Sequence, residues 1–172
     1  SGDLAATVMQ VSGDAGAGSG IDLKTAWKGM LRERTARGAL AFIFLVSAAN
    51  DNLFVVYGAW LEQSFGLGIV AIGLGTSAIG LAELAGETMT VALADRFGLK
   101  RSVMTGLAIC ITLYVMLPLI SQSISLAFVS LFLIFVAFEF MIVASVSMAT
   151  ELLPEARATM MAAYMGAAGF GR

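Results

Sequence analysis

Long apolar runs divide this chain into segments long enough to cross a membrane. Four runs cover roughly 39–61, 69–94, 102–120 and 125–149, and a fifth opens near residue 158. A helix needs about 20 mostly apolar residues to cross the hydrocarbon core of a bilayer. Alternating segments of about ten residues, typical of a transmembrane barrel, do not occur. The pattern therefore predicts an all-α membrane protein, a polytopic bundle of about five transmembrane helices.

Composition supports a location in lipid and excludes several function classes. Hydrophobic residues make up 59% of the chain and charged residues only 13%, far from the composition of a soluble domain. A net charge of −2, with no basic patch among aromatic residues, argues against a nucleic-acid partner. Histidine, the commonest metal ligand and usual general base, does not occur. We therefore expect no cofactor, no metal site and no enzyme activity.

The residues before the first run differ in character. Gly, Ala, Ser and Asp dominate residues 1–22, which predicts a flexible linker. Along 23–37, apolar residues alternate with lysine and arginine at helical spacing, which predicts a basic amphipathic connector on the membrane surface. A calmodulin-type target helix is the alternative for that segment. The transmembrane bundle then occupies 38–172, with its fifth span truncated.

Lysine and arginine alternate between the two ends of the predicted spans. They gather before the first span, between the second and third, and after the fourth, and avoid the other turns. Because basic loops stay in the cytoplasm, this pattern places 1–38, 95–101 and 151–157 on the cytoplasmic side. It leaves Arg172, inside the fifth span, without an assignment.

The loop between the second and third spans carries a recognisable motif. It reads LADRFGLKR, and it resembles the loop signature of the major facilitator superfamily, G-x-L-A-D-R-x-G-R-K/R-R. The matching residues are Asp95, Arg96, Gly98, Lys100 and Arg101. Val91 replaces the first glycine of the pattern, and Leu99 replaces the first arginine of its basic run.

A second loop, ELLPEAR, also resembles this family. Through Glu151, Pro154 and Arg157 it is similar to the segment that follows the fourth and tenth spans of such transporters. The resemblance implies a second-half fragment, from the central loop into the eleventh span, with the other half of the transporter missing. It also implies a drug/proton-antiporter-like protein in a bacterial inner membrane.

The resemblance further implies a cytoplasmic gating latch. In the family, the aspartate of the loop motif caps a neighbouring helix, and the arginine pairs with an acid on another loop. The residues that match are Asp95, Arg96, Lys100, Arg101, Glu151 and Arg157. Positive-inside topology and attraction between charges and helix ends explain these residues equally without any gating.

Four acids lie within the predicted spans, where charge is expensive. They are Asp51, Glu83, Glu87 and Glu139. An ionised acid at a helix centre costs about 2.5 to 3.5 kcal/mol on insertion scales. Each acid must therefore be protonated, face a wet cavity or have a basic partner, and the first four spans contain no lysine or arginine. A proton or the substrate can offset their charge, as in coupled transport.

The helical positions of these acids suggest roles. Glu83 and Glu87 lie on one stripe of α-helical positions that also includes Thr76, Gly80 and Thr90. We therefore expect Glu83 to bind a proton or cation and Glu87 to relay it. A structural hydrogen-bonding pair is the alternative. Glu139 stands alone among apolar residues, where it could bind a lipophilic cation or bond to another helix.

A polar triplet interrupts the first span. Asn50, Asp51 and Asn52 lie near its middle, where amides are costly unless hydrogen-bonded. The triplet either contacts substrate or joins two helices.

Together these observations predict a secondary active transporter that works by alternating access. We expect proton-coupled efflux of small organic or drug-like molecules, with protons, the substrate and the lipid bilayer as partners. A sugar or small-metabolite transporter is one alternative, and a non-transporting subunit or receptor is another.

Overall fold

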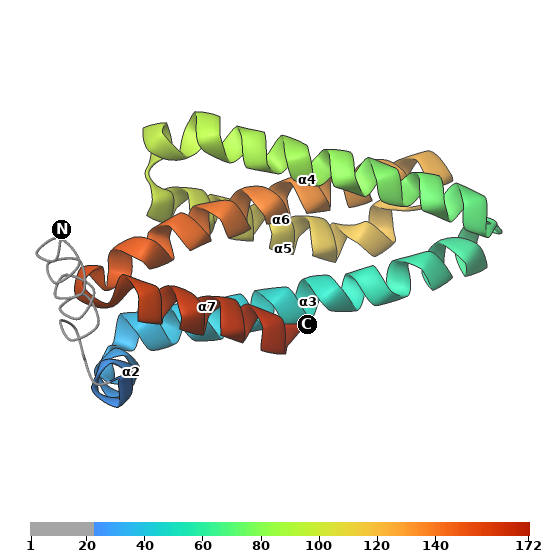
Figure 1. Ribbon diagram of the computed structural model, residues 1–172. Helices are drawn as coiled ribbons and strands as arrows, with labels where there is room; N and C mark the ends of the chain where they lie inside the picture. Colours follow the sequence, from blue (N-terminus) through green and yellow to red (C-terminus); the bar gives the residue numbers. More distant parts are fainter. Residues whose placement is uncertain (1–22) are drawn as a thin grey trace, which may run out of the picture.

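The computed structural model describes residues 23–172, apart from the side chains at 23–26 and at Asp95. Every secondary-structure element of the described part is a helix (Figure 1). Its elements are α2 (Leu23–Arg32), α3 (Arg34–Phe65), α4 (Ile69–Phe97), α5 (Leu99–Ile120), α6 (Ile124–Leu152), the 3-10 turn η1 (Pro154–Ala156) and α7 (Arg157–Gly171). The linker predicted at 1–22 lies outside the described residues.

The four complete predicted spans are confirmed. Helices α3, α4, α5 and α6 are each long and apolar enough to cross a membrane. The helices extend beyond the apolar runs because polar turns at their ends continue the helical backbone, most clearly in α3, which begins at Arg34. The all-α membrane bundle predicted from the sequence is therefore the observed fold.

The basic segment before the first span is divided between two helices. Helix α2 ends at Arg32, and extended backbone at Glu33 separates it from α3. Arg34 and Arg37 consequently belong to the first turn of α3, in one continuous helix with the first span. Met30 of α2 is buried with Met160 of α7, so α2 is packed onto the bundle.

Helix α6 is the centre of the packing. It packs along both α4 and α5, while α3 packs mainly along α7 (Figure 1). The buried side chains of α6, including Leu131, Ile134 and Phe135, contribute to a core that also contains Leu61 of α3 and Ala82 of α4. Outward-facing apolar residues such as Ile69 and Val91 remain exposed, as expected for helices surrounded by lipid.

Two glycines make the tight turns at the helix ends. Gly66 ends α3 with φ +65°, and its backbone N–H donates to the Glu62 carbonyl over 2.8 Å. Gly98, the glycine of the loop motif, has φ +80° and both ends α4 and begins α5. Because L-residues with side chains rarely adopt positive φ, glycine is required at both turns. The turn at Gly98 fixes the position of Lys100 and Arg101 on the first turn of α5.

Candidate functional site

Helices α4 and α6 approach each other most closely at Gly86. A Cβ atom on Gly86 would lie 2.6 Å from the Val136 carbonyl oxygen and 2.8 Å from the Glu139 Cβ atom. One turn further along α4, the buried Thr90 hydroxyl lies 2.9 Å from the Gly86 carbonyl oxygen of its own helix and 3.2 Å from the Phe140 carbonyl oxygen of α6, and it donates its proton between these two acceptors. The absence of a side chain at Gly86 is therefore what lets the two helices cross beside Glu139.

This crossing brings together three of the four predicted acids. Gly86 lies between Glu83 and Glu87 on α4, and both carboxyls are close enough to Glu139 to act on it electrostatically. Glu83 and Glu139 are half-buried and Glu87 is exposed. Glu83 and Glu139 also lie near the middle of their helices, which corresponds to the middle of the bilayer. We call Glu83, Glu87 and Glu139 the acidic cluster.

Arg172, at the end of α7, provides a positive charge near the acidic cluster. It too lies close enough to Glu139 to act on it electrostatically. Gly171 packs directly against the Phe44 carbonyl and the Ser47 side chain of α3, and the end of α7 reaches the middle of the bundle (Figure 1). A helix of 15 residues rises about 22 Å. The number of residues between the start of α7 and Arg172 is therefore the sequence signal for the position of Arg172, because a rise of that length carries this residue from the membrane surface to about mid-depth.

The polar triplet of α3 is not part of the acidic cluster. Asp51 is half-buried and is not among the charged groups that act on Glu139. Asn52 is exposed, and its amide donates to the Ala48 carbonyl of its own helix over 2.8 Å. The buried Asn50 Oδ1 atom accepts no hydrogen bond from the described residues. A substrate contact by this triplet stays a prediction.

Two hydroxyl pairs join helices on either side of the acidic cluster. Tyr57 of α3 is hydrogen-bonded to Thr76 of α4, a member of the stripe that includes Glu83 and Glu87. Ser145 of α6 and Tyr164 of α7 are hydrogen-bonded over 2.7 Å, and both are buried. In this stripe the hydroxyl side chains bond to neighbouring helices, while the two acids lie near Glu139.

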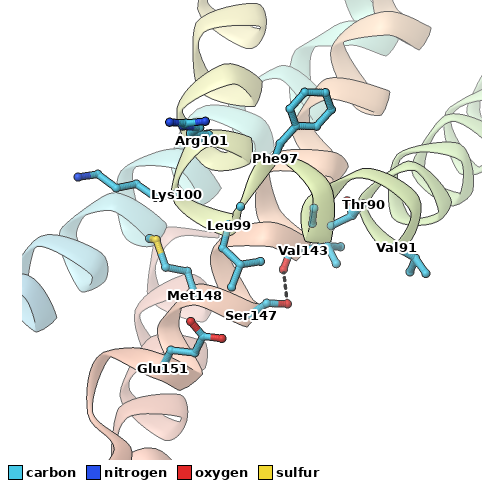
Figure 2. A pocket seen from close by; sticks show the side chains of 12 residues that line it. Thr90, Val91, Phe97, Leu99, Lys100, Arg101, Val143, Ser147, Met148 and Glu151 are labelled. Atoms are coloured by element: carbon cyan, nitrogen blue, oxygen red, sulfur yellow. Dashed lines mark hydrogen bonds between the residues drawn. The ribbon is translucent and has the colours of Figure 1, made fainter.

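A cavity of about 870 Å³ opens between the ends of α4, α5 and α6 that carry the loop motifs. Lys100 and Arg101 of α5 and Glu151 of α6 contribute charged side chains to its wall. Figure 2 shows both basic side chains pointing away from Glu151, and no ion pair joins these three residues.

The other predicted latch residues are not placed at this cavity. Arg96 and Arg157 are exposed and do not line it, and the side chain of Asp95 lies outside the described part of the structure. The structure thus groups three of the six latch residues around a cavity, and the latch itself remains a prediction. Within residues 23–172, no set of His, Cys, Asp or Glu side chains is arranged to hold a metal ion.

Comparison with known proteins gives one result on the family. The profile described as Major Facilitator Superfamily matches residues 39–172, which includes both loop motifs, the acidic cluster and Arg172. Comparisons with curated proteins and with solved structures gave no significant match. Because the profile covers well over half of the chain, the chain belongs to the major facilitator superfamily, a family of membrane transporters.

Proposed function

We propose that this transporter couples substrate movement to protons through the acidic cluster. The observation that carries the proposal is the arrangement of Glu83, Glu87 and Glu139 around the α4–α6 crossing, with Arg172 as the nearby cation. Three carboxyls and one guanidinium leave an excess of negative charge near the middle of the bilayer. Uptake of a proton or binding of a cation offsets that excess.

The Glu83 and Glu87 carboxyls repel the ionised form of Glu139. A proton taken up from one side of the membrane relieves the repulsion, and a cationic substrate approaching from the other side competes with it. Competition between a proton and a cation at one site is the basis of antiport.

The position of the cluster fits alternating access. Carriers of this kind bind substrate near the bilayer midplane and expose that site to each side in turn. Glu83 and Glu139 lie at mid-helix, and apolar rings, including the T-shaped pair of Phe54 and Phe135, lie on the neighbouring α3 and α6. An amphipathic organic cation could use both the negative charge and the aromatic surface. We therefore favour efflux of drug-like cations from a bacterial inner membrane.

A sugar or small polar metabolite is the second candidate substrate class. The observation in its favour is the buried Asn50 Oδ1 atom, which lacks a donor among the described residues. A substrate hydroxyl could donate to that oxygen, and an unpaired buried acceptor is costly enough to make such binding favourable. This class predicts that Asn50→Ala reduces transport more than Glu83→Gln.

The test is a flux measurement on the full-length transporter in proton-loaded vesicles. A panel of lipophilic cations is offered with and without a pH gradient, using the parent, Glu83→Gln and the control Glu62→Gln. Glu62 is an exposed acid near the end of α3, away from the cluster. We expect gradient-driven flux in the parent and the control and its loss in Glu83→Gln. Flux that is independent of the gradient in every variant would refute proton coupling. No flux for any cation would favour the sugar or small-metabolite class or the non-transporting alternative.

A further inference from the structure

The 870 Å³ cavity at the loop-motif end combines a charged mouth with an apolar wall. Lys100 and Arg101 lie on the first turn of α5, and Glu151 lies on the last turn of α6 (Figure 2). The remaining wall is mostly apolar, with Val91, Phe97, Leu99, Val143 and Met148. The positive-inside rule places this end at the cytoplasmic leaflet, whose surface carries anionic lipids.

A second cavity, of about 500 Å³, adjoins the first at Phe97. Phe97 lines both cavities, and nearly all other residues of the second are apolar side chains of α4, α5 and α6. The cavity includes Ser102 and Leu113 of α5, which are separated by a helical rise of about 16 Å. The hydrocarbon core of a bilayer is about 30 Å thick. The apolar cavity therefore spans about one leaflet in depth, as an acyl chain does.

We propose that these two cavities form a binding site for one anionic glycerophospholipid of the phosphatidylglycerol type. The phosphodiester lies between Lys100 and Arg101, and one acyl chain occupies the apolar cavity beyond Phe97. This site is distinct from the acidic cluster at mid-depth, and its existence does not depend on the proposed transport of cations.

The charges at the mouth select the headgroup. Lys100 and Arg101 supply two cations for one phosphodiester anion, and the first turn of α5 contains no acid that would oppose it. Glu151 on the far side of the cavity can accept hydrogen bonds from the hydroxyls of a glycerol headgroup. Its negative charge also disfavours lipids with a second phosphate. A single-phosphate anionic lipid with a hydroxylated headgroup fits all three residues.

The test is lipid retention by the full-length protein in nanodiscs of equal phosphatidylglycerol and phosphatidylcholine, released into a native mass spectrometer. The parent is expected to keep one phosphatidylglycerol molecule. The double variant Lys100→Gln/Arg101→Gln should bind it about 30-fold more weakly, given the usual contribution of a basic residue at an anionic surface. The matched control Lys28→Gln/Arg32→Gln removes the same charge from exposed positions of α2 and should retain it.

A second variant tests the acyl-chain half of the site. Thr105 is exposed and lines the apolar cavity, so Thr105→Phe should fill the space and release the lipid without changing any charge. Equal phosphatidylglycerol retention by the parent, the Lys100/Arg101 variant and Thr105→Phe would overturn the proposal. Preferential retention of phosphatidylcholine, or of phosphatidylethanolamine when that lipid is supplied in its place, would overturn it as well.

Discussion

Gly86 of α4 lies so close to Glu139 of α6 that a Cβ atom added to the glycine would come within 2.8 Å of the glutamate Cβ. It would come still closer, 2.6 Å, to the Val136 carbonyl oxygen, a backbone atom that moves only if α6 moves. One missing methyl group therefore sets the distance between the two helices that carry the acidic cluster.

Gly86→Ala should destabilise the bundle and separate the cluster. Inserting a methyl group into a close-packed interface typically costs about 1 to 3 kcal/mol, so the thermal unfolding temperature in detergent should fall. The control is Gly80→Ala on the same helix, where an added Cβ meets nothing within 4 Å. Alanine is the better helix former, so the control should be neutral or slightly stabilising. Equal effects of the two substitutions would show that the close crossing is not needed.

The Ser145–Tyr164 hydrogen bond should contribute modestly to the attachment of α7. The two oxygens are 2.7 Å apart in a buried site, and Ser145 also donates to its own helix at the Ile142 carbonyl. Hydrogen bonds between membrane helices average about 0.6 kcal/mol in double-mutant cycles. A cycle of Ser145→Ala, Tyr164→Phe and the double variant, followed by unfolding, should give a coupling energy of that size. A value of zero would mean that packing alone holds α7.

Arg172 and Glu139 should be energetically coupled. Arg172→Gln removes the cation near the acidic cluster, so it should lower the unfolding temperature, whereas Arg172→Lys should preserve most of the stability. Adding Glu139→Gln to Arg172→Gln removes one of the unbalanced acids and should recover part of the loss. Strictly additive effects of the two substitutions would show that the two charges do not interact.

Gly98→Ala should be costly because of its backbone conformation. The residue has φ +80°, and no atom lies within 4 Å of an added Cβ, so any effect must come from backbone strain. Strain of this kind costs about 1 to 3 kcal/mol. The control is Gly29→Ala in α2, where there is equally open space and no positive φ. If Gly98→Ala is as stable as Gly29→Ala, the loop motif does not require a glycine at this position.

The sequence predicted the helices well because each span is recorded locally, in its length and its apolar content. The break at Glu33 was missed, since basic and apolar residues alternate at helical spacing on both sides of it. Helical spacing correctly placed Glu83 and Glu87 on one face. It did not identify Glu139 as their neighbour, because that contact depends on the close approach of another helix at Gly86.

The sequence pattern also did not predict that Arg172 lies near the acidic cluster. Arg172 comes near the acidic cluster because α7 lies along α3, which is a property of helix packing. Lys100, Arg101 and Glu151 line one cavity, and the gating latch that the motif resemblance implied stays a prediction. Helix packing therefore determined both the position of Arg172 and the cavity between the loop motifs, which local sequence patterns do not predict.

The most direct test of proton coupling compares two transport modes in one variant. Glu139→Gln is reconstituted as the full-length transporter, and both equilibrium exchange of a transported cation and its accumulation driven by a pH gradient are measured. If the acidic cluster carries the coupling proton, exchange should persist while gradient-driven accumulation is lost. Accumulation at the level of the parent would contradict the account.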